Sequence, residues 1–178
     1  LRLQHTRNIM IRSQPDGEMD YADLEESLRI HRDTPPIFFL NAGTTMTGAV
    51  DRVDRVLDMA RRLCLPHHYI HVDAALSGMI LPFVENPPPW NFAAGIDSLS
   101  ISGHKMLGSP LPCGVALARK NHVDRVARSV EYIGALDTTI SGSRNAITPV
   151  LLWYALRSHG VAGLRERVER SLALADHA

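Results

Sequence analysis

The chain has 178 residues, of which 45% are hydrophobic and 21% are charged, a composition typical of globular proteins rather than disordered or fibrous ones. Basic and acidic residues balance at 19 each, which gives no electrostatic reason to expect nucleic acid or an anionic membrane as a partner. The two cysteines form neither a metal-ligand spacing nor a disulfide framework, and no apolar run suggests export or a membrane span. These features predict a cytoplasmic protein that acts on a small molecule.

The first part of the chain alternates strand-like and helical patterns. The predicted elements are a strand over 8–12, a helix over 21–30, a strand over 37–40 and a helix over 52–63. Asp20 precedes the first helix, and Asp23 completes a pattern like a capping box. The apolar run at 37–40 predicts a buried parallel strand, and Asp51 is the predicted N-cap of the second helix.

The pattern continues with strands over 67–72, 96–102 and 114–118, a helix over 123–130, and helices after Pro149 that Gly160 separates. This alternation predicts an α/β fold with a mostly parallel sheet and flanking helices. We place a domain boundary near residue 145, where periodicity is lost and regained. Neither end resembles a natural terminus, so we expect a fragment of a longer polypeptide.

Two chemically complementary side chains follow predicted strands. Asp73 ends one strand, and Lys105 follows the next after a glycine. Open α/β sheets bind ligands at the carboxyl ends of their strands. A lysine that condenses with an aldehyde and a carboxylate that keeps a pyridine nitrogen protonated are the minimum equipment for pyridoxal phosphate chemistry. The alternative is a surface lysine and an aspartate that caps a helix.

Three histidines lie close to Asp73, at positions 67, 68 and 71. Successive side chains on one face of a strand are nearly 7 Å apart, so these residues converge poorly on a single metal ion. We therefore predict no metal site. His71 shares a strand face with Asp73, and we expect either a hydrogen bond to that carboxylate or an ordinary core histidine.

Four stretches resemble the group II pyridoxal-phosphate-dependent amino acid decarboxylases: residues 43–51, 71–83, 100–114 and 141–149. The similarity is greatest to the bacterial histidine decarboxylases that use this cofactor and to the plant serine decarboxylases. It implies fold type I, the aspartate aminotransferase type, in a homodimer or higher homo-oligomer. Residues 1–145 would be part of the large, cofactor-binding domain, with a mobile loop near 131–145, and residues 146–178 would lead toward the C-terminal domain.

The same resemblance implies roles for individual residues. Lys105 matches the Schiff-base lysine, and Asp73 matches the partner of the pyridine nitrogen. Ala75 matches the small residue that packs on one face of the ring. His104 would lie beside the cofactor, where it could bind phosphate or assist proton transfer. Two more residues match cofactor-binding positions: Ser102, before the lysine, and Thr45, in the glycine-rich and threonine-rich loop.

The resemblance implies decarboxylation of an amino acid to its amine and CO2 with pyridoxal 5′-phosphate as cofactor. Histidine, which would give histamine, is the best-matched substrate, with serine next and a branched aliphatic amino acid such as valine third. Transamination on the same fold, or a catalytically silent homologue that acts as an interaction protein, is the alternative. The tyrosine that reprotonates the α-carbon in many relatives is not identified here.

Overall fold

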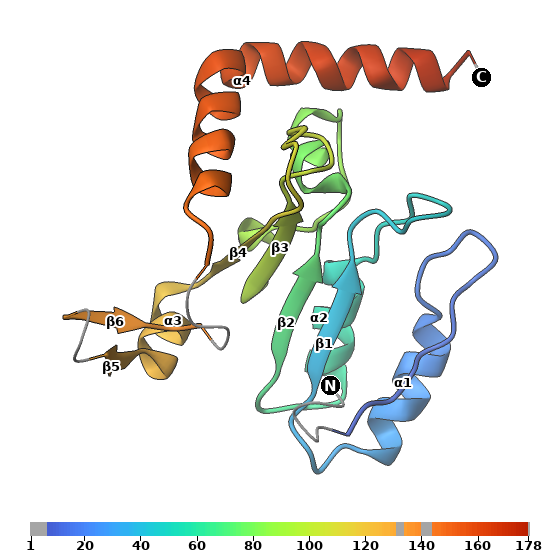
Figure 1. The fold of residues 1–178 in the computed structure, drawn as a ribbon. Helices are drawn as coiled ribbons and strands as arrows, with labels where there is room; N and C mark the ends of the chain where they lie inside the picture. Colours follow the sequence, from blue (N-terminus) through green and yellow to red (C-terminus); the bar gives the residue numbers. More distant parts are fainter. Residues whose placement is uncertain (1–6, 131–133, 140–143, 178) are drawn as a thin grey trace.

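The computed structural model describes residues 7–130, 134–139 and 144–177. A sheet of four strands in the order β1-β2-β3-β4 forms its centre (Figure 1). Strands β1 (Ile37–Asn41), β2 (Tyr69–Asp73) and β3 (Ser98–Ser102) are parallel, and β4 (Gly114–Ala118) is antiparallel to β3. The predicted α/β fold with a mostly parallel sheet is confirmed.

Helices α1 (Tyr21–Ile30) and α2 (Val53–Arg62) pack with the sheet into one hydrophobic core. The core side chains come from one face of the sheet and from the apolar sides of the helices, and they include Leu24, Phe38, Leu40, Val53, Val56, Ile70, Val72 and Leu99. On the opposite face of β1, Ile37 is 69% and Phe39 is 60% exposed. The prediction that the strand is buried on both faces is therefore wrong, because the described residues cover only one face of β1.

Asp20 caps α1 as predicted, since its side chain accepts hydrogen bonds from the N–H groups of Ala22 and Asp23. The reciprocal half of the capping box is absent. Asp23 instead accepts the N–H of Arg12 at 2.7 Å and pairs with the guanidinium of that arginine. The strand predicted over 8–12 is wrong. The bonds to Asp23 hold this segment beside α1 instead of in the sheet, and the isolated bridge that comes next joins Ser13 to Met19.

The predicted N-cap role of Asp51 is wrong as well, because α2 begins at Val53 and its N-cap is Arg52, which makes no side-chain capping bond. The Asp51 carboxylate is 3% exposed and accepts the N–H groups of Met19, at 2.8 Å, and Asn41, at 2.7 Å. Asp51 therefore joins the turn before α1 to the end of β1. The Asp51 side chain thus accepts N–H groups from other segments instead of those at the start of α2.

The helix predicted over 123–130 begins and ends earlier, as α3 (Lys120–Val126). The residues after it form β5 (Arg128–Val130), which pairs with β6 (Ala135–Asp137) in a separate hairpin. Pairing with β6 fixes these residues as a strand, and that partner is not visible in the local sequence pattern. Parts of the predicted mobile loop, residues 131–133 and 140–143, lie outside the described residues.

Helix α4 (Ile147–Ala175) has two halves that meet at Gly160, whose φ of 59° and ψ of −173° are not helical, as the sequence predicted. The second half runs across the ends of the parallel strands (Figure 1) and buries Leu164 and Val168. Three short 3-10 segments precede β3: η2 (Ser77–Met79), η3 (Leu81–Phe83) and η4 (Phe92–Ala94). The domain boundary near residue 145 stays a prediction. No helix in the described ranges is long and apolar enough to cross a membrane.

Candidate active site at the strand ends

The carboxyl ends of β1, β2 and β3 lie side by side and carry a row of polar residues. The strand register pairs Asn41 with Asp73 and Asp73 with Ser100. Paired residues of neighbouring strands point to the same face of a sheet, so the three side chains share the face opposite the hydrophobic core. Ser98 and Ser102, two residues before and two after Ser100, lie on the same face of β3. The sheet therefore presents a polar surface at the edge where open α/β folds bind ligands.

The two carboxylate oxygens of Asp73 have different surroundings. Oδ1 accepts the N–H of Ala75 at 3.0 Å and the hydroxyl of Ser100 at 3.5 Å. Oδ2 has no hydrogen-bond partner among the described residues. The first bond is an Asx turn, which fixes the direction of the side chain as the strand ends. Asp73 is thus held by one oxygen and offers the other as an acceptor.

Backbone hydrogen bonds join Asp73 to the turn that carries Lys105. The Ala75 carbonyl accepts the N–H of Ser102 at 3.3 Å, and the Ser102 carbonyl accepts the N–H of Lys105 at 3.4 Å. Five of the six predicted cofactor-site residues therefore belong to one connected region: Asp73, Ala75, Ser102, His104 and Lys105. The strand-end aspartate and the lysine are thus linked through Ala75 and Ser102, and their shared role at a cofactor stays a prediction.

The chain has two lysines, Lys105 and Lys120, and they differ in their partners. The Lys120 ammonium is held at 2.7 and 2.8 Å by the two oxygens of Asp124, one turn away on α3. The exposed Lys105 makes no ion pair within the described ranges. Lys105 is therefore the lysine whose amine is available for chemistry.

Gly103 allows the turn that carries Lys105 to pack closely. A Cβ at this position would lie 2.5 Å from both the sulfur of Cys113 and Cδ2 of Leu152, on α4. Its N–H donates to the Cys113 carbonyl at 3.0 Å. The glycine before the His-Lys pair thus lets the turn, the start of β4 and α4 meet.

His104 is exposed, and its Nδ1 lies 3.2 Å from the backbone nitrogen of Cys113. Nδ1 also lies 3.2 Å from the Cys113 carbonyl oxygen, so it accepts from that N–H in one tautomer and donates to that carbonyl in the other. In both tautomers Nε2 makes no hydrogen bond to the described residues and is open to a ligand. This arrangement suits a residue that binds phosphate or holds a proton beside the cofactor.

His71 does not hydrogen-bond Asp73. Its Nδ1 shares a hydrogen bond of 2.8 Å with the hydroxyl of Ser98, on β3. Its ring stacks at 4.7 Å on Phe39, on β1. Burial lowers the pKa of His71, and the charge of Asp73 opposes this shift only in part. Within the described ranges, no group of three or more histidine, cysteine, aspartate or glutamate residues could hold a metal ion.

Thr45 is exposed and makes no side-chain hydrogen bond within the described ranges, whereas Thr44 and Thr47 bond to each other at 2.7 Å. The loop of Thr45 reaches the strand ends through Gly43, where a Cβ would lie 2.0 Å from Oγ of Ser77. The structure therefore brings the loop, but not the Thr45 side chain itself, into contact with the residues after Asp73.

Sequence reasoning missed Ser100 as a partner of Asp73. The signal was the alternation of Ser98, Ser100 and Ser102 within one short strand, which places three hydroxyls on a single face. This period of two predicts that the serines share one face of the sheet with His71 and Asp73. It does not predict which serine lies beside which of these two residues.

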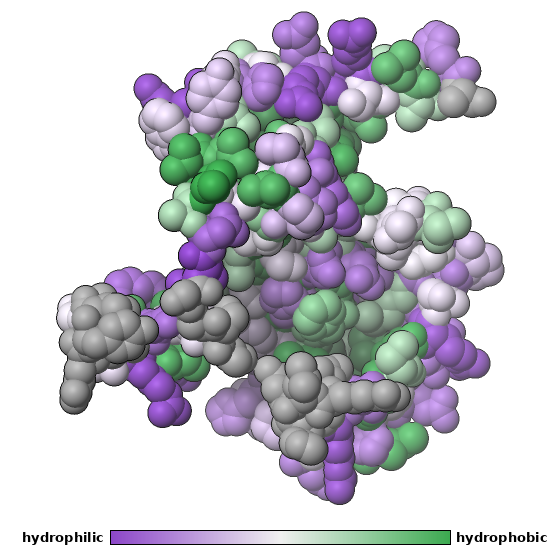
Figure 2. All heavy atoms as spheres, in the orientation of Figure 1, coloured by the Kyte–Doolittle hydropathy of each residue, from purple (hydrophilic) through white to green (hydrophobic). Residues whose placement is uncertain are grey.

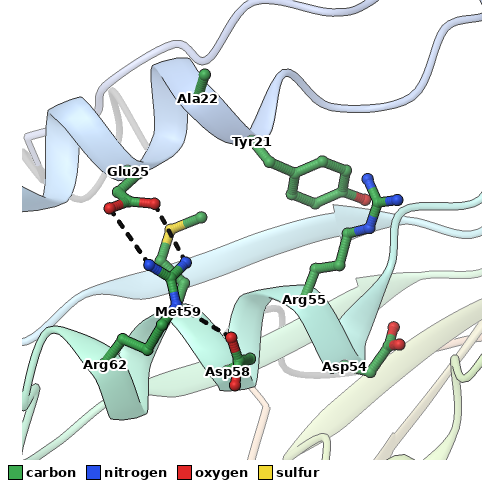
Figure 3. Close-up of a pocket in the computed structure, with 8 residues that line it drawn as sticks. All are labelled: Tyr21, Ala22, Glu25, Asp54, Arg55, Asp58, Met59 and Arg62. Atoms are coloured by element: carbon green, nitrogen blue, oxygen red, sulfur yellow. Dashed lines mark hydrogen bonds and ion pairs between the residues drawn. The ribbon is translucent and has the colours of Figure 1, made fainter.

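A depression of about 530 Å³ between α1 and α2 lies apart from these residues (Figure 3). Its charged side chains neutralise one another: Arg62 pairs with Glu25 at 3.1 Å and with Asp58 at 3.0 Å. Arg55 lies over the ring of Tyr21 at 4.9 Å. These pairs leave a shallow polar surface without chemistry related to the strand ends.

Comparisons with known proteins give the family of the chain. The sequence model of the pyridoxal-dependent decarboxylase conserved domain matches residues 2–178. A histidine decarboxylase from Raoultella ornithinolytica is 49% identical over 180 residues, which cover all of this chain and 79% of that protein. Histidine decarboxylases from Klebsiella aerogenes and Pseudomonas entomophila are 49% and 50% identical, over 100% and 94% of this chain. The chain spans 48% and 42% of the length of these two relatives.

Solved structures show the same fold. L-methionine decarboxylase from Streptomyces sp. 590 superposes with a TM-score of 0.75 at 27% identity, over 93% of this chain and 43% of that one. Mouse CSAD gives a TM-score of 0.73 at 24% identity, over 94% of this chain and 37% of that one. At this level of identity the second match concerns the fold alone. The fold is therefore that of the pyridoxal-phosphate enzymes of type I.

Proposed function

The chain belongs to the pyridoxal-dependent decarboxylase family, and from this premise we propose that its full-length protein decarboxylates histidine to histamine and CO2. The observation that carries the proposal is that Asp73 and Lys105 lie at connected strand ends, and that within the described residues one Asp73 carboxylate oxygen and the Lys105 amine have no partner. The cofactor is pyridoxal 5′-phosphate.

Three residues fit the ring and aldehyde of this cofactor. Asp73 would accept a hydrogen bond from the N–H of the protonated pyridine ring with Oδ2 and stabilise that ring by its negative charge. Lys105 would bind the aldehyde carbon through its amine and would exchange a proton at Nζ. Ala75 would present a methyl group to the ring, where a larger side chain would tilt the ring. When bound, pyridoxal phosphate supplies an electron sink for the electron pair that remains when CO2 leaves.

The phosphate group would lie near the turn after β3. His104 would donate from Nε2, and Ser102 would donate from its hydroxyl. Thr45 would contribute from the β1–α2 loop. These three assignments follow from the family resemblance, and the exposed position of His104 in the turn before Lys105 supports the first of them.

Histidine as substrate is supported by relatives that are 49% and 50% identical and carry the name histidine decarboxylase. A site that pairs the two imidazole nitrogens rejects amino acids that lack such groups, because it would leave buried polar atoms without partners. Serine and valine are the competing substrates.

We also propose a cytoplasmic homodimer. Exposed apolar side chains on the first half of α4 support a subunit interface: Ile147, Val150, Trp153 and Tyr154. Figure 2 shows hydrophobic surface, in green, over this segment. The free thiols of Cys64 and Cys113 agree with a reducing compartment. Light scattering should give the mass of two chains, whereas a monomer at micromolar concentration would contradict the dimer.

The test is to incubate the full-length protein and pyridoxal phosphate with each of the twenty amino acids while CO2 and amines are measured. Histidine should give the highest kcat/KM and release histamine and CO2 in equal amounts. A higher value for serine or valine would overturn the substrate but not the reaction. A keto-acid product without CO2 would indicate transamination, and a full-length protein that retains no cofactor would indicate a silent homologue.

A further inference from the structure

A row of three side chains crosses the sheet two residues before Asp73, and two of them share a hydrogen bond. The strand register places Phe39, His71 and Ser98 beside one another on β1, β2 and β3. The His71 ring lies between the other two, stacked on Phe39 and bonded to the Ser98 hydroxyl at 2.8 Å. Ser98 is 8% exposed and His71 is half-buried, so this bond is partly shielded from water. The position and orientation of the imidazole are therefore fixed from both sides.

The charged surroundings of His71 come from one residue. Asp73 lies two positions further on the same face of β2, and its charge is the one that acts on His71 among the described residues. The β1 neighbours Phe39 and Asn41 and the β3 neighbours Ser98 and Ser100 are uncharged. Tyr69, two positions earlier, turns its ring to His122 at 5.2 Å.

The bond to Ser98 keeps His71 apart from Asp73, whose Oδ1 is held by Ala75 and Ser100. A protonated imidazole in this place would attract the carboxylate and would compete with the positive ring nitrogen of the cofactor. A neutral imidazole does not compete for the Asp73 carboxylate, so the negative charge acts on the ring nitrogen alone. Burial, which lowers the pKa of His71, favours the neutral form.

We propose that His71, oriented by Ser98 and Phe39, is a positioning residue that stays uncharged so that Asp73 directs its full charge to the cofactor ring nitrogen. This proposal rests on the proposed function, because it concerns how the same site holds its cofactor. Ser98 acts through His71, and neither residue touches the reacting atoms.

Substitution of Ser98 separates this role from simple packing. In the full-length protein, Ser98→Ala removes the hydroxyl and frees the imidazole to turn toward Asp73. The NMR titration midpoint of His71 should then move to higher pH, and the acid limb of kcat/KM and the acid limit of cofactor affinity should move with it. Ser98→Thr, which keeps the hydroxyl, should leave all three quantities near their wild-type values.

A matched pair at position 71 tests the charge directly. His71→Met and His71→Lys introduce side chains of similar length that differ by one positive charge. His71→Met should bind pyridoxal phosphate within a few-fold of the wild-type dissociation constant, and its kcat/KM should lose the His71 acid limb. His71→Lys should weaken cofactor binding and lower kcat/KM many-fold.

The imidazole resonances of His71 can be assigned from the signal that disappears in His71→Met, since the chain has nine histidines. An unchanged titration in Ser98→Ala, or equal cofactor affinity in His71→Met and His71→Lys, would overturn the proposal. A wild-type protein that binds no cofactor and releases no CO2 would overturn the proposed function, whereas the titration decides separately whether Ser98 controls His71.

Discussion

At the scale of single residues, the site depends on how the carboxylate of Asp73 is divided between two tasks. The N–H of Ala75 and the hydroxyl of Ser100 occupy Oδ1, and Oδ2 remains as an acceptor. A carboxylate about 4 Å from a pyridinium is worth roughly 4 kcal/mol at an effective dielectric near 20. That energy is enough to keep the ring protonated at neutral pH. One oxygen therefore supports the structure, and the other would support the proposed chemistry.

Asp73→Asn keeps the shape and the bond to Ala75 but replaces Oδ2 by an amide nitrogen, which cannot accept a proton. We expect kcat to fall by several orders of magnitude while some cofactor remains bound to the lysine. Steady-state kinetics and borohydride trapping measure the two effects, with Asp124→Asn on α3 as a control that keeps its activity. Near-normal turnover in Asp73→Asn would remove this residue from the electron-sink role.

At the scale of secondary-structure elements, single close contacts determine where the turns lie. The turn after β3 depends on Gly103, because a Cβ at this position would come too close to the side chains of Cys113 and Leu152. The turn before α1 depends on Asp51, a buried carboxylate that accepts N–H groups from two segments. Both contacts act on the end of a strand that carries the candidate site.

Gly103→Ala should separate the Lys105 turn from α4, because its Cβ would lie 2.5 Å from two heavy atoms. Overpacking of this kind costs about 1–3 kcal/mol of unfolding free energy. We expect weaker cofactor binding as well as lower stability, measured by fluorescence titration and urea unfolding. Gly114→Ala is the matched control, since nothing lies within 4 Å of its Cβ. Equal effects of the two substitutions would show that the close contact is unimportant.

Asp51→Ala should leave the N–H groups of Met19 and Asn41 without their acceptor at a partly buried position. Loss of these two hydrogen bonds to a charged group should lower the unfolding free energy by roughly 2–3 kcal/mol. Urea unfolding measures the loss, and Asp124→Ala, which breaks an exposed ion pair, should cost about 1 kcal/mol or less. A loss at Asp51 no greater than at Asp124 would refute the bridging role.

At the scale of the whole molecule, stability should fall on acidification. Backbone donation from Arg12 lowers the pKa of Asp23, and hydrogen bonds from Arg62 lower the pKa of Glu25. These groups stabilise the fold above their unfolded pKa values near 4, and this contribution is lost as the pH falls through the folded values. Burial lowers the pKa of His71, so protonation also favours unfolding as the pH falls below about 6.5.

Thermal unfolding measured from pH 8 to pH 3 checks this expectation. The melting temperature should be highest near pH 8 and should fall in two stages, a small one below about 6.5 and a larger one below about 4. A melting temperature that rises on acidification in either interval would contradict the assigned directions of these pKa shifts.

Sequence periodicity predicted strands β1 to β4 because each carries a local apolar pattern, and it predicted the start of α1 because that helix carries its own cap at Asp20. It failed where a partner lies far along the chain. The Asp51 side chain bonds a nitrogen 32 residues away, and His71 bonds Ser98, 27 residues away. The family resemblance of the residues around Asp73 and Lys105 pointed to the proposed chemistry, whereas the contacts of Ser98 and Ser100 required the strand register.

The central claim, that Lys105 holds pyridoxal phosphate, is tested most directly by borohydride reduction of the full-length protein loaded with the cofactor, followed by peptide mass mapping. The chain offers two lysines, and the amine of Lys120 is already bound by Asp124. We predict a reduced phosphopyridoxyl group on Lys105 in stoichiometric amount and none on Lys120, with the label lost in Lys105→Ala. A label on any other lysine, or one that persists at wild-type yield in Lys105→Ala, would contradict the account.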